Sequence, residues 1–277
     1  MLKSPINYIG NKYSLLPQLL PLLPQTKNFI DLFGGSFTLG INMDSEQLYY
    51  NEYDEKVFNL IKFLCQVDPD NFLREVDEKI KLYGLSKTNK ESFYEFRNFY
   101  NQEESTELNL FILLCFSYNH QIRFNRKGFF NTPHGTGTTH FSSTMRNNFV
   151  LFNERAKQKS ISFSNKDFNL FDMSKLVEDT LVYCDPPYLI SLATYNENGA
   201  WNLEKEKGLL SFLSDINALG GKFALSNLTH HKGKKNDLLL DWIEENGYHI
   251  SEIRKKYKSQ KTHNNTQKTR EVLVTNY

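Results

Sequence analysis

The sequence is poor in cysteine and has no long hydrophobic run, and these absences exclude several classes of protein. Only three cysteines occur in 277 residues, and no two of them form a C-x-x-C pair. This pattern argues against a disulfide-stabilised domain and against a zinc site, and it favours a reducing compartment. No apolar stretch approaches the roughly 20 residues of a membrane span, and the first residues lack the pattern of a secretory signal peptide. We therefore predict a cytoplasmic protein without a membrane partner and without a bound metal.

Two common nucleotide-binding signatures are also absent. No G-x-G-x-x-G follows the first predicted strand, which argues against a nicotinamide-dependent oxidoreductase. A Walker lysine is missing as well, which argues against a P-loop enzyme.

Charge is balanced over the whole chain but unevenly distributed. Lys and Arg number 33 against 32 Asp and Glu. Residues 108–153 contain no acid, and residues 254–270 contain none but hold seven Lys or Arg. Acid-free basic stretches are typical of a polyanion-binding face, although solvated loops can have the same composition.

The order of predicted elements indicates an α/β fold. The first part contains a helix over 14–23, a strand over 28–33 that ends in Gly34-Gly35, a helix over 37–43 and a strand over 48–52. This order, in which a strand, a glycine turn, a helix and a second strand ending in an acid follow one another, is typical of the start of a parallel nucleotide-binding sheet. The last part contains strands over 161–163, 180–184, 222–227, 250–257 and 271–277, and helices over 204–219 and 237–245.

Residues 56–155 interrupt this alternation. Charged helices are predicted over 70–83 and 91–100, a very apolar segment over 108–116, and a polar, basic region over 119–148. We therefore predict one domain formed by residues 1–55 and 156–277, with an inserted, mostly helical domain over 56–155.

A tetrapeptide, Asp185-Pro186-Pro187-Tyr188, directly follows the strand predicted at 180–184. Prolines cannot donate to a sheet and their rings fix the backbone, so nearby acceptors point in set directions. The Asp185 carboxylate and the Pro186 carbonyl can accept both hydrogens of a planar exocyclic amine, which leaves the nitrogen lone pair free to attack. The Tyr188 ring can stack on the base, a contact worth about 1–3 kcal/mol. A plain Pro-Pro turn with a helix-capping aspartate is the alternative.

A second group of candidate residues surrounds the first predicted strand. Glycines such as Gly35 let a ligand approach the backbone closely, although an ordinary tight turn fits the same letters. Glu52 ends the next strand, about 20 residues later, where an acid can bind ribose hydroxyls. Asp54 is placed to cap a following helix.

Together these motifs resemble those of the Dam-like adenine-specific DNA methyltransferases. The resemblance rests on the following segments, in this order: Tyr8-x-Gly10-x-Lys12, Asp31-Leu32-Phe33-Gly34-Gly35, Asn51-Glu52, residues 123–135, Lys166-Asp167-Phe168, Asp185-Pro186-Pro187-Tyr188 and residues 271–277. Residues 123–135 resemble the family's R-(Y/F)-N-x-x-G-x-F-N-x-P-x-G stretch. The resemblance extends over essentially the whole chain.

This resemblance implies a Rossmann-like, S-adenosylmethionine-dependent methyltransferase sheet with an inserted target-recognition domain. The implied activity is site-specific transfer of a methyl group to the N6 amine of an adenine flipped out of duplex DNA. The implied catalytic residues are Asp185, Pro186 and Tyr188. The implied cofactor-binding residues are Tyr8, Lys12, Asp31 beside the methionine part, Phe33, Gly35, Glu52 at the ribose, Asp167 and Phe168 at the adenine, and Asp185. Two departures stand out, because Phe37 replaces a usual glycine and Tyr8 a common tryptophan.

The basic half of the insertion is predicted to bind double-stranded DNA. Phosphate contacts by Lys and Arg supply affinity, and contacts to base edges supply specificity. The candidates are Arg123 for a base or phosphate, Asn119, His120 and Gln121 for base edges, and the neighbouring Arg126 and Lys127. Asn125 and Asn131 are interpreted as turn formers, and His134 and His140 as surface histidines.

Two alternatives remain open at this point. Methylation of the cytosine N4 amine needs similar acceptors, and a catalytically silent DNA-binding relative would keep the fold. Cytosine-ring methylation is disfavoured because Cys184 is not in a Pro-Cys pair, and we expect Cys184 to be buried. The sequence does not distinguish a restriction–modification system, whose cognate endonuclease would act on the same site without a stable complex, from a phage or housekeeping role.

Overall fold

The computed structural model describes residues 1–172, 179–191, 201–254 and 269–277. They form two compact units. Unit 1 consists of residues 1–13, 35–42 and 54–160, and unit 2 of residues 14–34, 43–53 and 161–277. The predicted boundaries of the inserted domain, at 56 and 155, stay a prediction.

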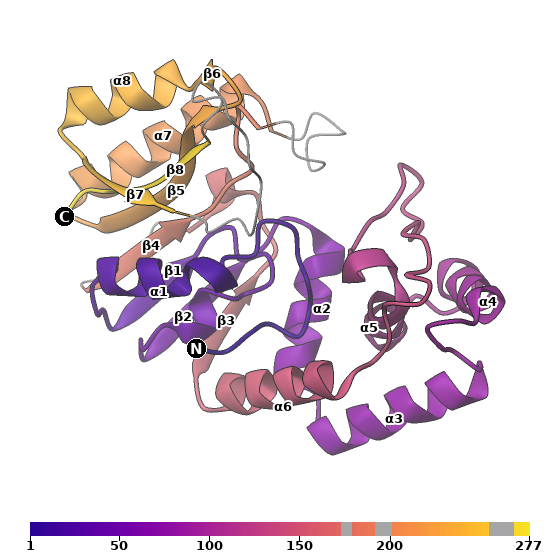
Figure 1. Cartoon of the computed structure of the whole chain (residues 1–277). Helices are drawn as coiled ribbons and strands as arrows, with labels where there is room; N and C mark the ends of the chain where they lie inside the picture. Colours follow the sequence, from indigo (N-terminus) through magenta and orange to yellow (C-terminus); the bar gives the residue numbers. More distant parts are fainter. Residues whose placement is uncertain (173–178, 192–200, 255–268) are drawn as a thin grey trace. The chain divides into compact units, whose positions relative to one another are not determined.

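Unit 2 is built on a mostly parallel sheet (Figure 1). Its strands are β1 (Asn28–Asp31), β2 (Gln47–Asn51), β3 (Ser160–Ser164), β4 (Thr180–Cys184), β5 (Lys222–His231), β6 (Lys234–Lys235), β7 (His249–Ile253) and β8 (Arg270–Thr275). The order is β3-β2-β1-β4-β5-β8-β7, with β6 paired to β5. β1 runs parallel to β2 and β4, and β4 parallel to β5, whereas β8 is antiparallel to both β5 and β7. The predicted Rossmann-like α/β class is thereby confirmed.

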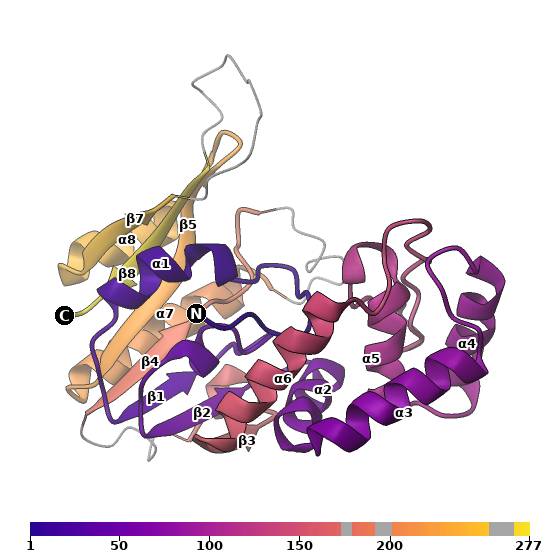
Figure 2. The same cartoon turned by 60° about the horizontal axis from the view of Figure 1, so that its bottom comes forward.

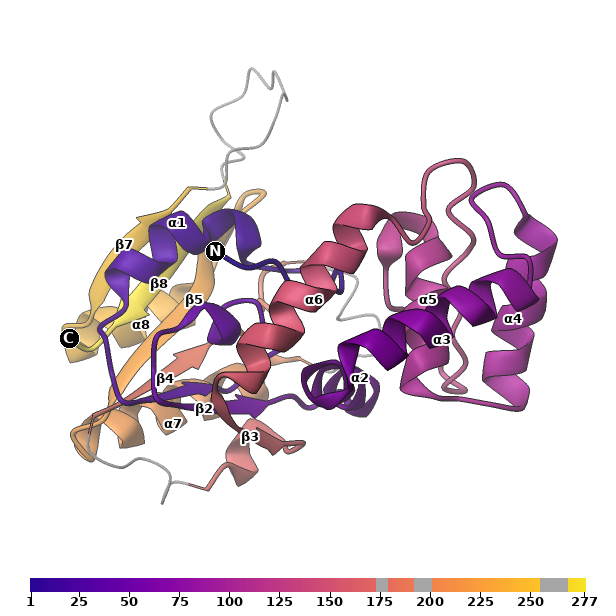
Figure 3. The same cartoon turned by 90° about the horizontal axis from the view of Figure 1, so that it is seen from below.

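Helices cover both faces of this sheet. The short α1 (Leu16–Leu19) lies on one face, and α7 (Leu203–Ala218) and α8 (Asp237–Asn246) lie on the other (Figures 2 and 3). The core on the second face joins apolar residues of α7 and α8, such as Leu213 and Leu239, to strand residues such as Val182 and Phe223. Cover on both sides explains why every residue of β4 is buried, since a central parallel strand has no solvent face.

Unit 1 is mainly helical. Its α-helices are α2 (Glu55–Gln66), α3 (Pro69–Leu82), α4 (Lys90–Gln102), α5 (Glu107–Phe116) and α6 (Ser143–Lys157). α5 packs against α2, α3 and α4, so every residue from Leu108 to Phe116 is buried. Side-chain caps begin these helices; Asp54, for example, accepts from the backbone N–H groups of Lys56 and Val57 at 2.9 and 3.2 Å, as expected for an N-cap.

Three sequence predictions need correction. The helix predicted over 37–43 is only a 3-10 turn at Gly40–Asn42, because Phe37 has a φ of +56°, which no helix residue adopts. The helix predicted over 14–23 is broken into a 3-10 turn, α1 and a second 3-10 turn, since Pro17 and Pro21 lack the N–H that a continuous helix needs. α6 was not predicted, because its many polar surface residues obscure the helical spacing of its few apolar residues.

The described part of β7 ends at Ile253, and residues 255–257 of the strand predicted over 250–257 lie outside the described residues. Most of the basic stretch 254–270 lies outside them too. Within the described ranges, no helix is long and apolar enough to span a membrane. The same ranges contain no cluster of three or more His, Cys, Asp or Glu residues suited to a metal ion.

Candidate active site

Three of the predicted motifs end at the same edge of the sheet of unit 2. In the parallel register, Asp31 at the end of β1 lies opposite both Tyr50 of β2 and Tyr183 of β4. Asn51 and Asp185 therefore follow Asp31 at the carboxyl ends of neighbouring strands. Ligands of open α/β sheets bind at this edge.

Asn51 fixes the loops that leave this edge. Its side-chain amide donates to the carbonyl oxygens of Leu32 and Lys166, each at 3.0 Å, and its side-chain oxygen accepts from the Lys166 N–H at 3.2 Å. A buried side chain thus ties the segments after β1, β2 and β3 together. Sequence reasoning placed Asn51 in a motif but did not identify this role, because its partners lie 19 and 115 positions away.

The glycine turn after β1 is shaped by packing. A Cβ atom at Gly34 would overlap the Tyr50 ring, and the Gly34 N–H donates to the Asn51 carbonyl at 2.8 Å. Gly34 is therefore needed for close contact between the chain and β2. Asp31 and Glu52 are both buried, with 2% and 8% of their surfaces exposed.

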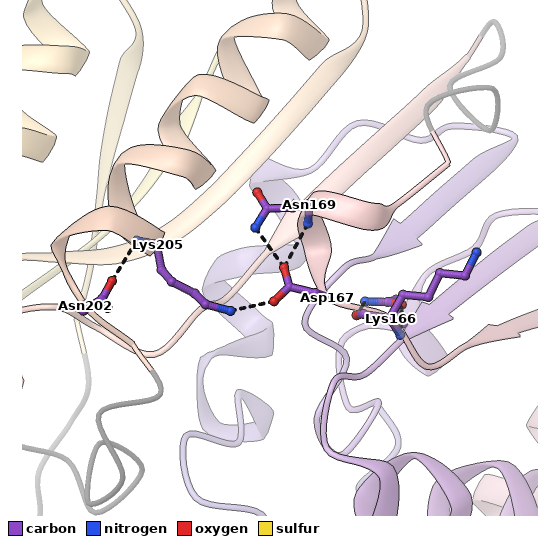
Figure 4. Close-up of polar contacts among 6 residues, drawn as sticks. Lys166, Asp167, Asn169, Asn202 and Lys205 are labelled. Atoms are coloured by element: carbon purple, nitrogen blue, oxygen red, sulfur yellow. Dashed lines mark hydrogen bonds and ion pairs between the residues drawn. The ribbon is translucent and has the colours of Figure 1, made fainter.

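Asp167 lies in a network of hydrogen bonds and one ion pair (Figure 4). Its carboxylate accepts from Lys205 Nζ at 2.6 Å and from the backbone N–H and side-chain amide of Asn169 at 3.1 and 2.9 Å. Burial raises the pKa of Asp167, but the bonds from Lys205 and Asn169 outweigh it and hold this pKa below its ordinary value. Lys205 stands in the first turn of α7, which Asn202 caps at 2.9 Å. Sequence reasoning missed Lys205.

Phe168 and Phe33 belong to an aromatic cluster. The Phe168 ring lies 5.6 Å from Phe33 and 5.8 Å from Trp201, and Phe33 lies 5.7 Å from Trp201. Phe168 is buried and Phe33 is half-buried. The structure thus brings two predicted cofactor-binding residues together, with Trp201 as a third member that the sequence analysis did not include.

The tetrapeptide after β4 makes two polar contacts through its tyrosine. The Tyr188 hydroxyl is 2.9 Å from Asp185 Oδ1 and 3.1 Å from Glu271 Oε1 on β8. Burial and the nearby carboxylates raise the pKa of Tyr188 well above its ordinary value, so the phenol stays protonated. Cys184 is fully buried, as expected, and burial raises the pKa of its thiol well above the usual range, which disfavours a nucleophilic thiolate.

Tyr8, Lys12 and Gly35 belong to unit 1. Tyr8 begins a turn in which its carbonyl accepts from the Asn11 N–H at 3.1 Å, and Gly10 has a φ of +85°. Lys12 is buried, and its ammonium donates to the Gly10 carbonyl at 3.4 Å. Gly35 has a φ of +48°, a conformation that glycine adopts without strain.

The three predicted DNA-binding cations lie in a hairpin-like loop of unit 1. Phe124 and Phe130 form an isolated β-bridge, and the Asn131 N–H donates to the Arg123 carbonyl at 3.0 Å. Asn125 closes the tip by accepting from the N–H groups of Lys127 and Phe129, which confirms its turn role. The exposed residues of this loop include the three predicted cations, Arg123, Arg126 and Lys127.

The polar residues before this loop make backbone contacts. The Asn119 carbonyl accepts from the Asn7 side chain at 2.8 Å, His120 Nδ1 lies 3.0 Å from the Leu114 carbonyl, and the Gln121 carbonyl accepts from Thr132 at 3.0 Å. Asn119 is exposed, and His120 and Gln121 are half-buried.

One histidine was predicted wrongly. His134 is buried and not on the surface, because its two ring nitrogens lie 3.0 Å from the Thr136 hydroxyl and 3.1 Å from the Ser86 carbonyl. His140 is exposed, as predicted.

Comparison with known proteins identifies the family. Residues 8–269 match the D12 class N6 adenine-specific DNA methyltransferases. The chain is 39% identical to modification methylase StsI of Streptococcus sanguinis and 38% identical to the type II methyltransferase M.FokI of Planomicrobium okeanokoites. Each of these matches covers 100% of the chain but 43% of the relative, so the chain spans less than half the length of either.

A shorter relative is matched over most of its length. The DNA adenine methylase of Escherichia coli K12 is 22% identical over 263 residues, which cover 92% of this chain and 88% of that protein. Together with the motif order and the sheet topology, these matches lead to one conclusion. The chain belongs to the D12 class N6 adenine-specific DNA methyltransferase family.

Proposed function

We propose that this chain transfers a methyl group from S-adenosylmethionine to the N6 amine of a flipped adenine at a specific site in duplex DNA. The observation that carries the proposal is the position of the Asp185 tetrapeptide, which follows β4 at the same sheet edge as Asp31 and Asn51. An amine acceptor and a set of carboxylates for a nucleoside ligand thereby share one edge.

The chemistry of the residues at this edge fits S-adenosylmethionine. The cofactor carries an ammonium group and ribose hydroxyls, and buried carboxylates such as Asp31 and Glu52 suit both. Asp167, Phe168 and Phe33 are proposed to shape the adenine subsite. Tyr8, Lys12 and Gly35 are proposed as further residues that contact the cofactor. When bound, the cofactor supplies a methyl group activated by a sulfonium.

The residues of the tetrapeptide orient the target amine. Asp185 and the Pro186 carbonyl accept its two hydrogens, and the Tyr188 ring holds the flipped base by stacking. The buried thiol of Cys184 gives no reason to invoke a covalent enzyme intermediate. Rate enhancement then comes from orientation and from acceptors already aimed at the nitrogen.

Duplex DNA is the proposed macromolecular partner. The exposed cations Arg123, Arg126 and Lys127 support phosphate binding by unit 1, and Asn119, His120 and Gln121 lie just before them in the chain. The relatives named modification methylases support a role beside a cognate restriction endonuclease that acts on the same site without a stable complex. A cytoplasmic location is proposed as well, because it would give access to this DNA substrate.

Methylation of plasmid DNA with a radiolabelled donor, followed by nucleoside analysis, tests the proposal. We expect N6-methyladenine. Detection of N4-methylcytosine would show that the proposed target base is wrong, and the absence of any methylated base would contradict the proposed activity. Asp185→Ala should abolish transfer while donor binding, measured by calorimetry, is largely kept. Asp215→Asn, on the exposed side of α7, serves as a control that should keep full activity.

A further inference from the structure

The Tyr188 hydroxyl joins two carboxylates that come from distant parts of unit 2. Asp185 follows β4, whereas Glu271 lies on β8, opposite Leu228 of β5 and Ile253 of β7. The two O···O distances, 2.9 and 3.1 Å, are both within hydrogen-bond range. Asp185, Tyr188 and Glu271 therefore form a continuous row of oxygen atoms.

This row has two O···O contacts, but the phenol supplies a single hydrogen for them. A phenol has one hydrogen to donate, and ionised carboxylates only accept. Because burial and the two carboxylates raise the pKa of Tyr188 well above its ordinary value, that one hydrogen is present at neutral pH. The two contacts share it, so the row can take up one more proton without losing a hydrogen bond.

Methylation of an amine creates one surplus proton. The nitrogen lone pair forms the new N–C bond, the electron pair of the old S–C bond stays on the donor's sulfur, and one N–H proton must leave. Asp185, which accepts an amine hydrogen in the proposed function, is the first group that this proton meets.

We propose that Glu271 is the final acceptor of this proton, reached from Asp185 through the Tyr188 hydroxyl. Protonated Asp185 donates to the Tyr188 oxygen while Tyr188 passes its own hydrogen to Glu271, so Asp185 and Tyr188 return to their starting forms. Glu271 is half-buried and can release the proton to solvent. This inference rests on the proposed function.

The groups around Tyr188 favour this route. Asp185, Glu271 and Tyr183 all raise the pKa of Tyr188. The Tyr183 hydroxyl lies 2.8 Å from the Ser226 hydroxyl in the core and thus has a different partner. The neighbouring carboxylate on β7, Glu252, is paired with Arg254 and Arg270.

Glu271→Gln tests the proposal, because glutamine keeps the size and an oxygen that accepts from Tyr188 but takes up no proton. We expect kcat to fall about 10²-fold, the lower end for a positioned proton acceptor, with the KM for DNA and the Kd for the donor little changed. Loss of the negative charge on Glu271, which is joined to Asp185 through Tyr188, should also move the acid limb of the kcat profile to lower pH. A purely structural role would lower kcat at every pH and leave the limb in place.

Two further variants complete the design. Tyr188→Phe keeps the stacking ring but breaks the row, and the double variant with Glu271→Gln should be no slower than the slower single variant, since both remove one pathway. Glu252→Gln is the matched control on the adjacent strand and should behave as the unmodified protein.

Retention of full kcat in Glu271→Gln or in Tyr188→Phe overturns the proposal, as does an unmoved acid limb in Glu271→Gln. If Glu271→Gln does not fold, the kcat of Tyr188→Phe alone tests the proposal. Absence of transfer by the unmodified protein would instead overturn the proposed function, so the two failures are distinguishable.

Discussion

At the scale of single residues, Asn51 holds together the backbone segments that form the site. Its side chain bonds to the Leu32 carbonyl in a buried contact, and to the carbonyl and N–H of Lys166 in partly buried contacts. Buried polar groups without partners cost about 1–3 kcal/mol each. The edge of the sheet is therefore preorganised by a neutral side chain.

Asn51→Ala should lower the free energy of unfolding by at least about 2 kcal/mol, because several of these groups lose their partner. Urea denaturation followed by fluorescence measures the change. Asn246→Ala, at the exposed C-terminal end of α8, removes the same amide and one hydrogen bond, to the Trp242 carbonyl at 2.8 Å, and should lower stability by only about 0.5–1 kcal/mol. Equal effects of the two variants would show that Asn51 does not organise the site.

Phe37 presents two opposing effects at one position. Its φ of +56° is a conformation that costs a non-glycine residue about 1–2 kcal/mol. Its side chain is fully buried, and truncation of a buried phenylalanine costs about 3–5 kcal/mol. Phe37→Gly should therefore destabilise the protein, by roughly 1–4 kcal/mol after the relief of strain. A higher midpoint of urea unfolding for the glycine variant would show that the strain is the larger effect.

At the scale of elements, the sequence predicted the strands better than the helices around them. Strands such as β1 and β4 are short apolar runs that end at glycine or proline, and both signals are local. The region 37–43 was misread because the left-handed Phe37 has no signature in the letters. α6 was missed because its buried face becomes apparent only when α2 and α3 are packed against it.

The site shows the same division between local and distant information. The positions of Asp31, Glu52 and Asp185 at this edge could be predicted because each ends or directly follows a strand. Lys205 and Glu271 could not, because each reaches its partner from another element, 38 and 83 positions away in the sequence. Pairings over such distances depend on the order of strands in the sheet, which no short motif encodes.

The loop that carries Arg126 and Lys127 gives a prediction about DNA affinity. Each phosphate contact contributes about 0.9 to the dependence of log K on log salt concentration. Arg126→Ala with Lys127→Ala should weaken DNA binding and make this slope less negative by about 2. Arg74→Ala with Lys81→Ala removes the same charge from exposed positions of α3 and serves as the control. Fluorescence anisotropy at several salt concentrations measures both, and equal slopes for the two pairs would remove the loop from the interface.

At the scale of the whole molecule, the division into two compact units raises the question of whether they unfold together. Both tryptophans, Trp201 and Trp242, lie in unit 2. Tryptophan fluorescence therefore follows unit 2 alone, whereas far-UV circular dichroism also follows the helices of unit 1. Divergent urea curves from the two probes would show that the units unfold independently.

Glu206 gives unit 2 a distinct dependence on pH. This fully buried carboxylate accepts from Trp201 at 2.7 Å, from Asn227 at 3.0 Å and from Asn236 at 3.2 Å. Burial raises its pKa above the ordinary value of 4.5, although the three hydrogen bonds oppose this shift. Between 4.5 and the raised pKa, the folded state binds more protons than the unfolded state, so stability increases as pH falls through that window.

Glu206→Gln should remove this component of the pH dependence. At neutral pH the variant should be less stable, because an amide cannot accept from all three donors, and one unpaired buried donor costs about 1–3 kcal/mol. On acidification towards pH 4.5, the unmodified protein should gain stability relative to the variant, as measured by tryptophan fluorescence in urea. Asp167, whose pKa is lowered by Lys205, loses its contribution only at lower pH and is common to both proteins. Parallel stability curves for the two proteins would show that Glu206 ionises alike in the folded and unfolded states.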